Sequence, residues 1–405
     1  MTGRISVDVG IVGAGPVGGA LACRLGTAGI AAALIDRAPL PPMEHPDFDG
    51  RAYAVATGSR PVLEQAGLWD ALPFPAGPIH DIRVSDGRVG RRASRLFLHF
   101  DSGEAGGGAF GWMVEARSLR MAINARLHAL PAISLHAPAE AKVRFGQEGA
   151  IIALADGTEI ACRLVVAAEG RRSPLREQAG IRVTHLPYNQ TGIVCAIGHE
   201  RPHNNTALEH FLPGGPFAQL PMAPTEGAPN LSAIVWTERT PVAQRLLALD
   251  DAGFTRELSR RLGDHLGAAR LLGRRWSYPL SAMLVHRLTA PRLALAGDAA
   301  HGIHPIAGQG LNLGFRDITT LSQLVIEAVQ AGEDPGSPAL LRRYQAARRP
   351  DNMMMLGVTD TLDRLFSTDN RLLRAARDLG IAAVHRTPPL KRLFMRAAMG
   401  TRVGR

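Results

Sequence analysis

Three closely spaced glycines near the N-terminus have the spacing of a phosphate-binding turn. Gly13, Gly15 and Gly18 form a GxGxxG motif between an apolar run and a stretch typical of a helix. Such a turn lets a pyrophosphate approach bare N–H groups at the positive end of a helix. Asp36 follows Gly13 by 23 residues, where a carboxylate can accept a hydrogen bond from a ribose 2′-hydroxyl. These residues predict a nucleotide with a free 2′-hydroxyl, such as FAD or NAD, rather than NADP.

A second glycine-rich stretch, residues 297–317, reads GDAAHGIHPIAGQGLNLGFRD. Its glycines precede and open a predicted helix, and no acidic residue stands between Asp298 and Asp317. Free N–H groups and the helix dipole favour an electron-rich ligand at such a start, whereas an acidic side chain would repel it. The stretch predicts that an electron-rich group approaches the backbone there.

The elements that must position these glycines alternate as in an α/β fold. Residues 7–12 and 31–35 read as buried strands on either side of the first helix, as at the start of a parallel sheet. Strand-like runs with Pro and Gly then dominate, and beyond Gly310 the sequence is mostly helical. We predict a Rossmann-like domain (1–180 and 281–335), an inserted, mostly β domain (181–280) and a helical C-terminal region (336–405).

Composition narrows the partners. The chain has 405 residues, 46% of them apolar, and a net charge of +10. Between Ala339 and Arg405 stand 14 Lys or Arg and 5 Asp, without zinc-finger spacing or interleaved aromatic residues, so nucleic acid is not predicted. This tail fits an anionic membrane surface or an acidic partner, and the alternative is a helical bundle that covers the cofactor domain. Its apolar residues include Met353, Met354, Met355, Leu356, Leu362, Leu365 and Phe366.

Cysteines and the N-terminus indicate the compartment. Cys23, Cys162 and Cys195 are far apart and form no CxxC, so neither a disulfide nor a metal site is predicted. The apolar run from Val7 to Ile35 is broken by glycines and charged residues and lacks the features of a signal peptide. We predict a cytoplasmic protein in peripheral contact with the inner membrane.

Two further motifs carry a family resemblance. LVVAAEGRRSPLRE (residues 164–177) and RLALAGDAAHGIHPIAGQGLNLGFRD (residues 292–317) resemble the second and third fingerprints of the class A flavoprotein aromatic hydroxylases, which share the para-hydroxybenzoate hydroxylase fold. The resemblance implies one FAD, NAD(P)H as co-substrate and no separate NADPH domain. It also implies that Asp298 bonds the ribityl chain and that the backbone of residues 308–312 approaches the flavin ring. The Rossmann-like domain would bind FAD, and the inserted domain would bind the substrate.

The motifs and the resemblance together predict a set of cofactor contacts. The family's usual Asp-Gly is Glu169-Gly170 here, and the arginines of DGRAYAVATGS and VEARSLR match positions near the flavin. We assign no general base or metal ligand, and we interpret His301 and His304 as packed loop histidines. The predicted FAD contacts are Gly13, Gly15, Pro16, Val17, Gly18, Asp36, Arg37, Arg51, Arg117, Glu169, Gly170, Gly297, Asp298, Pro305, Gly308, Gln309, Gly310, Leu311 and Asn312.

The C-terminal third resembles the ubiquinone-biosynthesis hydroxylases within that family. The segments are RRYQAARRPDNMMMLGVTDTLDRLFSTDN (residues 342–370) and PPLKRLFMRAAMG (residues 388–400). The resemblance implies ring hydroxylation of a polyprenylated phenol or quinol with NAD(P)H and O2, through a flavin C4a-hydroperoxide. It also implies other ubiquinone-biosynthesis proteins as partners. Candidate substrate contacts are Tyr188, Phe217, Leu220 and Pro221.

Three alternatives remain open. They are an FAD-dependent hydroxylase of another aromatic compound, an FAD reductase without oxygen chemistry, and a non-catalytic subunit of a ubiquinone-biosynthesis assembly.

Overall fold

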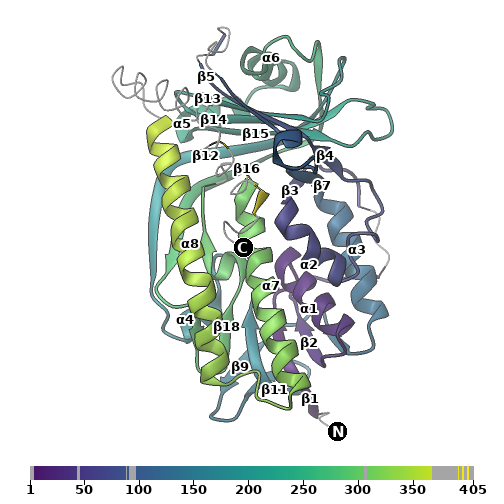
Figure 1. Ribbon diagram of the computed structural model, residues 1–405, viewed down its shortest axis with the longest axis vertical. Helices are drawn as coiled ribbons and strands as arrows, with labels where there is room; N and C mark the ends of the chain where they lie inside the picture. The colour runs from purple at the N-terminus through teal and green to yellow at the C-terminus, as the bar shows by residue number, and fades with distance from the viewer. Residues whose placement is uncertain are drawn as a thin grey trace.

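Two large sheets lie one above the other along the long axis of the molecule (Figure 1). The computed structural model describes residues 4–42, 46–87, 89–90, 97–304, 308–366, 391, 395 and 399–400. The predicted α/β class is confirmed, with a helical region following the sheets.

The first sheet has the parallel core that the strand-helix-strand pattern predicts. Its strand order is β17-β18-β11-β1-β2-β8, with β9 and β10 attached at β11. β1 pairs in parallel with both β2 and β11, and β18 continues the parallel arrangement. The strands are β1 (Arg4–Val12), β2 (Ala32–Ile35), β8 (Ile133–His136), β9 (Lys142–Phe145), β10 (Ala150–Ala153), β11 (Glu159–Ala167), β17 (Thr289–Ala290) and β18 (Leu293–Leu295).

The second sheet is mostly antiparallel, with the order β19-β16-β12-β15-β14-β13-β5-β6. Two of its strands, β5 and β6, come from early in the chain and join through a parallel pairing of β5 with β13. The predicted inserted domain of residues 181–280 therefore supplies most, but not all, of this sheet. The strands are β5 (Asp81–Asp86), β6 (Phe97–Asp101), β12 (Val183–His199), β13 (Thr206–Leu212), β14 (Gly215–Met222), β15 (Leu231–Arg239), β16 (Ala269–Val285) and β19 (His301–Gly302).

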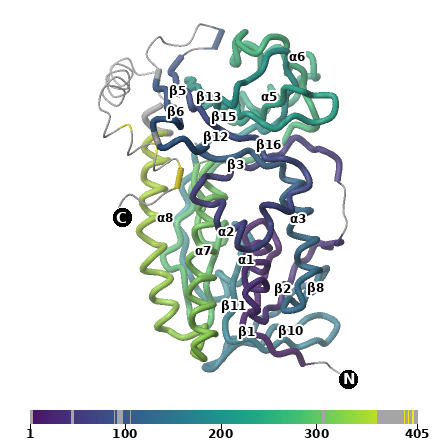
Figure 2. Tube along the Cα trace, turned by 45° about the vertical axis from the view of Figure 1, so that its right-hand side comes forward, coloured from purple at the N-terminus to yellow at the C-terminus, as the bar shows by residue number. Residues whose placement is uncertain are grey.

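A three-stranded sheet and the helices complete the fold. The small sheet has the order β3-β7-β4, formed by β3 (Ala52–Ala56), β7 (Gly111–Glu115) and β4 (Gly77–Ile79). α1 packs against α3 and α7, and α7 packs against α8, which runs along the side of the molecule (Figure 2). The helices are α1 (Pro16–Thr27), α2 (Arg60–Gln65), α3 (Ala116–Ala129), α4 (Pro174–Gln178), α5 (Thr240–Leu247), α6 (Asp251–Leu262), α7 (Gln309–Gln330) and α8 (Pro338–Phe366), with 3-10 turns η1 (Thr57–Ser59), η2 (Ser102–Ala105) and η3 (Gly297–Ala299).

All three cysteines lie inside the packed interior. Cys23, Cys162 and Cys195 are free thiols and are buried. Burial raises the pKa of Cys23 and of Cys195 to about 12, and that of Cys162 to about 11. These thiols are packing residues rather than nucleophiles.

Candidate active site

A cavity of about 1420 Å³ lies where the carboxyl ends of the parallel strands meet the face of the second sheet. The residues directly after β1, β2 and β11 all line it, namely Gly13, Asp36 and Ala168. Ligands of open parallel sheets bind at this edge, because the strand ends and helix N-termini converge there. The cavity therefore stands where the first glycine motif predicts a cofactor.

The glycines of the first turn have two different roles: two of them shape the turn, and one faces the cavity. Gly13 has a φ of +103°, and a Cβ there would overlap the carbonyl of Ala168. A Cβ at Gly18 would overlap the carbonyl oxygen of Gly13. At Gly15, which lines the cavity, a Cβ would meet no atom within 4 Å. Gly13 and Gly18 shape the turn, and Gly15 leaves open space in front of α1.

Asp36 both faces the cavity and holds the glycine turn in place. Its Oδ2 accepts a hydrogen bond from the Ala14 N–H at 2.6 Å, and its Oδ1 accepts one from Ala38 N–H at 2.7 Å. The carboxylate thus ties the end of β2 to the start of α1. Sequence spacing indicated its position but not this backbone contact.

The second glycine site opens α7, which packs beside α1. Gly308 is the N-cap with a φ of +62°, and a Cβ there would lie 2.9 Å from Cβ of Ala54. Gly310 lines the cavity, and a Cβ there would meet no atom within 4 Å. Among the described residues, no side chain caps α7, and the first turn of this helix contains no acidic residue. Its N–H groups and positive dipole end are therefore available to a ligand.

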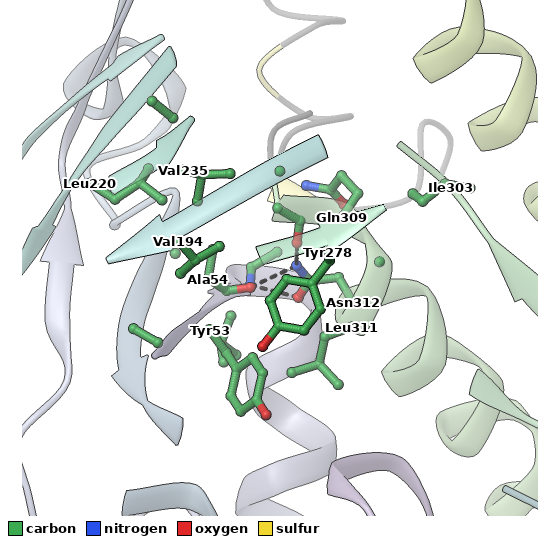
Figure 3. A pocket seen from close by; sticks show the side chains of 18 of the residues that line it. Tyr53, Ala54, Val194, Leu220, Val235, Tyr278, Ile303, Gln309, Leu311 and Asn312 are labelled. Carbon is green, nitrogen blue, oxygen red and sulfur yellow. Dashed lines mark hydrogen bonds between the residues drawn. The ribbon is translucent and has the colours of Figure 1, made fainter. Parts of the chain in front are cut away.

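Asn312 fixes this helix start against β3 (Figure 3). Its Oδ1 accepts a hydrogen bond from Ala56 N–H at 2.8 Å, and its Nδ2 donates to the carbonyl oxygens of Ala54 at 2.8 Å and Gly308 at 2.9 Å. The side chain is 1% exposed. We expected Asn312 to offer its backbone, and the structure adds that its amide positions the cavity wall.

A buried ionic cluster supports the third fingerprint from behind. Asp317 accepts hydrogen bonds from Gly297 N–H at 3.0 Å, from His301 Nε2 at 2.7 Å and from Arg348 Nε at 2.8 Å. Burial alone would raise the pKa of Asp317, but His301 and Arg348 hold that pKa below its usual value. His301 is thus a buried structural residue. Sequence reasoning missed Asp317 and Arg348, because a pairing between two helices leaves no local signal.

The loop after β11 supplies Glu169 and Gly170 to the cavity. Ser173 caps α4 by accepting from Arg176 N–H at 3.1 Å, and its hydroxyl donates to Glu169. Burial raises the pKa of the Glu169 carboxyl despite that hydrogen bond. Glu169 therefore combines a cavity position with a local structural contact.

The predicted arginines lie outside the cavity lining. Arg51 pairs with Asp49 at 2.7 Å and lies 4.4 Å from the centre of the Trp276 ring. Arg117 pairs with Glu115 at 2.7 Å and lies 4.0 Å from the centre of the Phe74 ring. Arg37 is exposed. Their contact with a cofactor stays a prediction.

The structure brings most other predicted contacts together. Gly18 and Gly297 support the turns without lining the cavity, and Pro305 lies outside the described residues. The cavity lining contains Gly13, Gly15, Pro16, Val17, Asp36, Glu169, Gly170, Asp298, Gly308, Gln309, Gly310, Leu311 and Asn312.

The remaining wall is the apolar face of the second sheet. Of the four candidate substrate contacts, Leu220 lines the cavity. Phe217 was a wrong candidate, because the alternation of β14 turns it into the opposite face, where it packs 5.9 Å from Trp236. Tyr188 packs against His304 instead, with ring centres 5.1 Å apart. Figure 3 shows Leu220, Val235 and Val194 on the sheet and Leu311 on α7.

These features fit an FAD molecule. Two helix N-termini without side-chain caps open onto one cavity, and each has a glycine with empty space in front of it. A dinucleotide has a pyrophosphate for the first site and an electron-rich ring system for the second. An apolar wall then continues beyond the cofactor positions.

Comparisons with known proteins identify the family. The profile of the FAD binding domain family (FAD_binding_3) matches residues 6–93 and 113–357. A ubiquinone hydroxylase, UbiL, of Rhodospirillum rubrum is 50% identical over 97% of this chain and 90% of its own length. The 3-demethoxyubiquinol 3-hydroxylase of Escherichia coli is 32% identical over 97% of this chain and 98% of its own.

Solved structures share the fold. PqsL of Pseudomonas aeruginosa, a probable FAD-dependent monooxygenase, has a TM-score of 0.75 at 22% identity, with 93% of this chain and 100% of that chain covered. The p-nitrophenol 4-monooxygenase PnpA of Pseudomonas putida has a TM-score of 0.76 at 18% identity, with both chains fully covered.

Fold, site and relatives thus define an FAD-dependent monooxygenase of the hydroxylase type. Within that class, the chain belongs to the FAD binding domain family and to its ubiquinone hydroxylases. Among the described residues, no helix is both long enough and apolar enough to cross a bilayer.

Proposed function

We propose that this enzyme hydroxylates the ring of a polyprenylated phenol or quinol in ubiquinone biosynthesis. The observation that carries the proposal is the mostly apolar cavity lining, which includes residues of the α7 start and the second sheet, Leu362 of α8 and Met395. A prenyl chain gains about 0.8 kcal/mol for each buried CH2, so such a wall favours a long hydrocarbon substituent. The names of the relatives in R. rubrum and E. coli support the same substrate class.

The protein's own residues bind the cofactor, orient the substrate and exclude water. FAD bound there would supply the redox and oxygen-activating chemistry, with NAD(P)H as the reductant. The N–H groups at Gly15 would hold the pyrophosphate, and those at the start of α7 would face the electron-rich part of the flavin ring. Asn312 keeps that helix start against β3. The apolar wall keeps water from the reacting ring.

We also propose that the outer face of α8 contacts an anionic membrane surface. Met353 and Met354 are 48% and 58% exposed, and Val358 is 44% exposed. Arg343 and Arg349 are exposed on the same helix. Met355, in contrast, is buried against Ile303 and Leu313, so the helix divides its apolar residues between core and surface. Since Leu362 of α8 lines the cavity, a membrane-borne substrate would enter near the end of this helix.

The direct test is turnover by the purified yellow protein. With NADH or NADPH and O2, we expect a triprenyl phenol to gain one oxygen by mass spectrometry, with matching NAD(P)H oxidation. The same phenol without its prenyl chain is the matched control and should be hydroxylated far more slowly. Faster hydroxylation of the soluble phenol would replace this proposal with the first alternative, and a product-free, colourless protein would favour the non-catalytic subunit.

A further inference from the structure

A row of side chains runs across the second sheet and forms the floor of the cavity. The strand registers place its members side by side on neighbouring strands β12, β15, β14, β13, β5 and β6. Every member lines the cavity. The row is Val194, Val235, Ala218, Glu209, Val84 and Leu98.

Glu209 is the single ionisable member of this row. Ala207 and Phe211, two residues before and after it on β13, also line the cavity. Its direct neighbours on the adjacent strands are Ala218 and Val84. The carboxyl group therefore stands in a wall that is otherwise apolar on each side.

Within the ranges that the structure describes, the Glu209 carboxyl has neither a hydrogen bond nor an ion pair. On the neighbouring strand β5, the acidic residue on the same face is Asp86, which is paired with Phe211 in the register and accepts a hydrogen bond from Gly87 N–H at 2.9 Å. Burial raises the pKa of Glu209 to about 7. A half-buried carboxyl in an apolar wall is unfavourable unless something bonds it.

We propose that the Glu209 carboxyl binds a ring hydroxyl of the aromatic substrate. The inference rests on the proposed substrate class and names the contact that orients it. A polyprenylated phenol carries its polar atoms on the ring alone, so the ring is the part of such a substrate that can form a hydrogen bond with Glu209. The Glu209 carboxyl can accept a hydrogen bond from a phenolic O–H, and in its ionised form that bond is charge-assisted and among the stronger kinds. Glu209 would select hydroxylated rings and fix their orientation.

The test compares a triprenyl phenol with its O-methyl ether, which cannot donate. Binding to the FAD-loaded protein is followed through the change in flavin absorbance. We expect the wild-type protein to prefer the phenol by about tenfold or more. Glu209→Leu should bring the ratio of phenol affinity to ether affinity close to one. Glu209→Gln should lower this ratio severalfold, because an amide is a weaker acceptor than a carboxylate. Val84→Ala, the matched control in the same row, should weaken both ligands alike and keep the ratio.

If both Glu209 variants keep the wild-type preference for the phenol over its methyl ether, the proposal is overturned. If Glu209→Leu fails to fold, judged by lost flavin absorbance, the isosteric Glu209→Gln decides alone. Failure of the proposed function looks different, because the wild-type protein would then not hydroxylate the triprenyl phenol. In that event the ratio is measured with the soluble phenol that is turned over and its methyl ether.

Discussion

Gly15 shows at the residue scale how a missing side chain makes a binding site. Its φ is −61° and a Cβ would meet no atom within 4 Å, so alanine fits the folded protein without strain. That Cβ would stand where we propose the pyrophosphate. We expect Gly15→Ala to weaken FAD binding by about tenfold or more, which corresponds to about 1.4 kcal/mol, with an unchanged melting temperature of the apoprotein. Equilibrium titration with FAD measures the effect.

A matched control separates this effect from a general effect of glycine replacement. Gly357 in α8 also has open space around it, and it lies outside the cavity lining. Gly357→Ala should leave FAD affinity as it is. Equal affinities for wild type and Gly15→Ala would contradict the assigned role of Gly15.

Asp317 makes a different residue-scale prediction, which concerns stability. Its folded pKa lies below the usual value, so its contribution is complete above the unfolded value of about 3.9 and is lost as the pH falls through the lower folded value. Asp317→Asn removes the buried charge that His301 and Arg348 share, although Arg348 keeps its pair with Asp351 at 2.6 Å. We expect this loss to cost about 3 kcal/mol at neutral pH. The difference in unfolding free energy between wild type and variant should narrow below pH 4.

Denaturant titrations between pH 3 and pH 7 measure that difference. Glu327→Gln is the control, because Glu327 forms an exposed pair with Arg343 at 3.7 Å and such pairs contribute about 1 kcal/mol or less. A constant difference across this pH range would show that the Asp317 charge is not the source of the stability.

At the scale of elements, the uncapped start of α7 should respond to charge. Gly310→Asp and Gly310→Asn both add a side chain of nearly equal size to the same open space. The aspartate also places a negative charge at the positive end of the helix, beside the electron-rich ring. We expect Gly310→Asp to bind FAD roughly twofold to thirtyfold more weakly than Gly310→Asn, with the gap shrinking in high salt. Equal affinities would exclude an electrostatic role for the α7 start.

The sequence predicted those elements whose function depends on the spacing of residues within a short segment. Gly13, Gly15, Asp36 and the residues at the start of α7 converge on one cavity because each follows a strand or opens a helix, and both features are visible in a short window. The helix predicted beyond Gly310 appears as α7, and α8 occupies the described start of the predicted C-terminal helical region.

Contacts between distant segments could not be predicted in this way. The pairing of β5 with β13 joins residues 81–86 to residues 206–211, and nothing in either segment indicates the other. The same holds for the bond of Asp317 with Arg348 and for the Asn312 contacts with β3. Glu209 was not predicted as a site residue, because a lone glutamate in a strand resembles a solvent-facing residue until the sheet register is known.

At the scale of the whole molecule, the proposed membrane contact predicts where binding to vesicles resides. Met353→Glu with Met354→Glu removes exposed apolar area from α8 and adds negative charge beside its arginines. We expect the double variant to bind vesicles rich in anionic lipid severalfold more weakly than wild type. Gln147→Glu, an exposed change in the turn between β9 and β10, should bind nearly as well as wild type. Sedimentation with vesicles at two salt concentrations measures the binding of each variant.

The most direct measurement is an experimental structure of the yellow protein with FAD and a triprenyl phenol bound. We expect phosphates at Gly15, the flavin ring beside Leu311 and Asn312, the aromatic ring at Glu209, and the prenyl chain along the apolar residues from Val84 to Leu98. A flavin bound elsewhere, with the space between α1, α7 and the second sheet free of ligand, would contradict this placement.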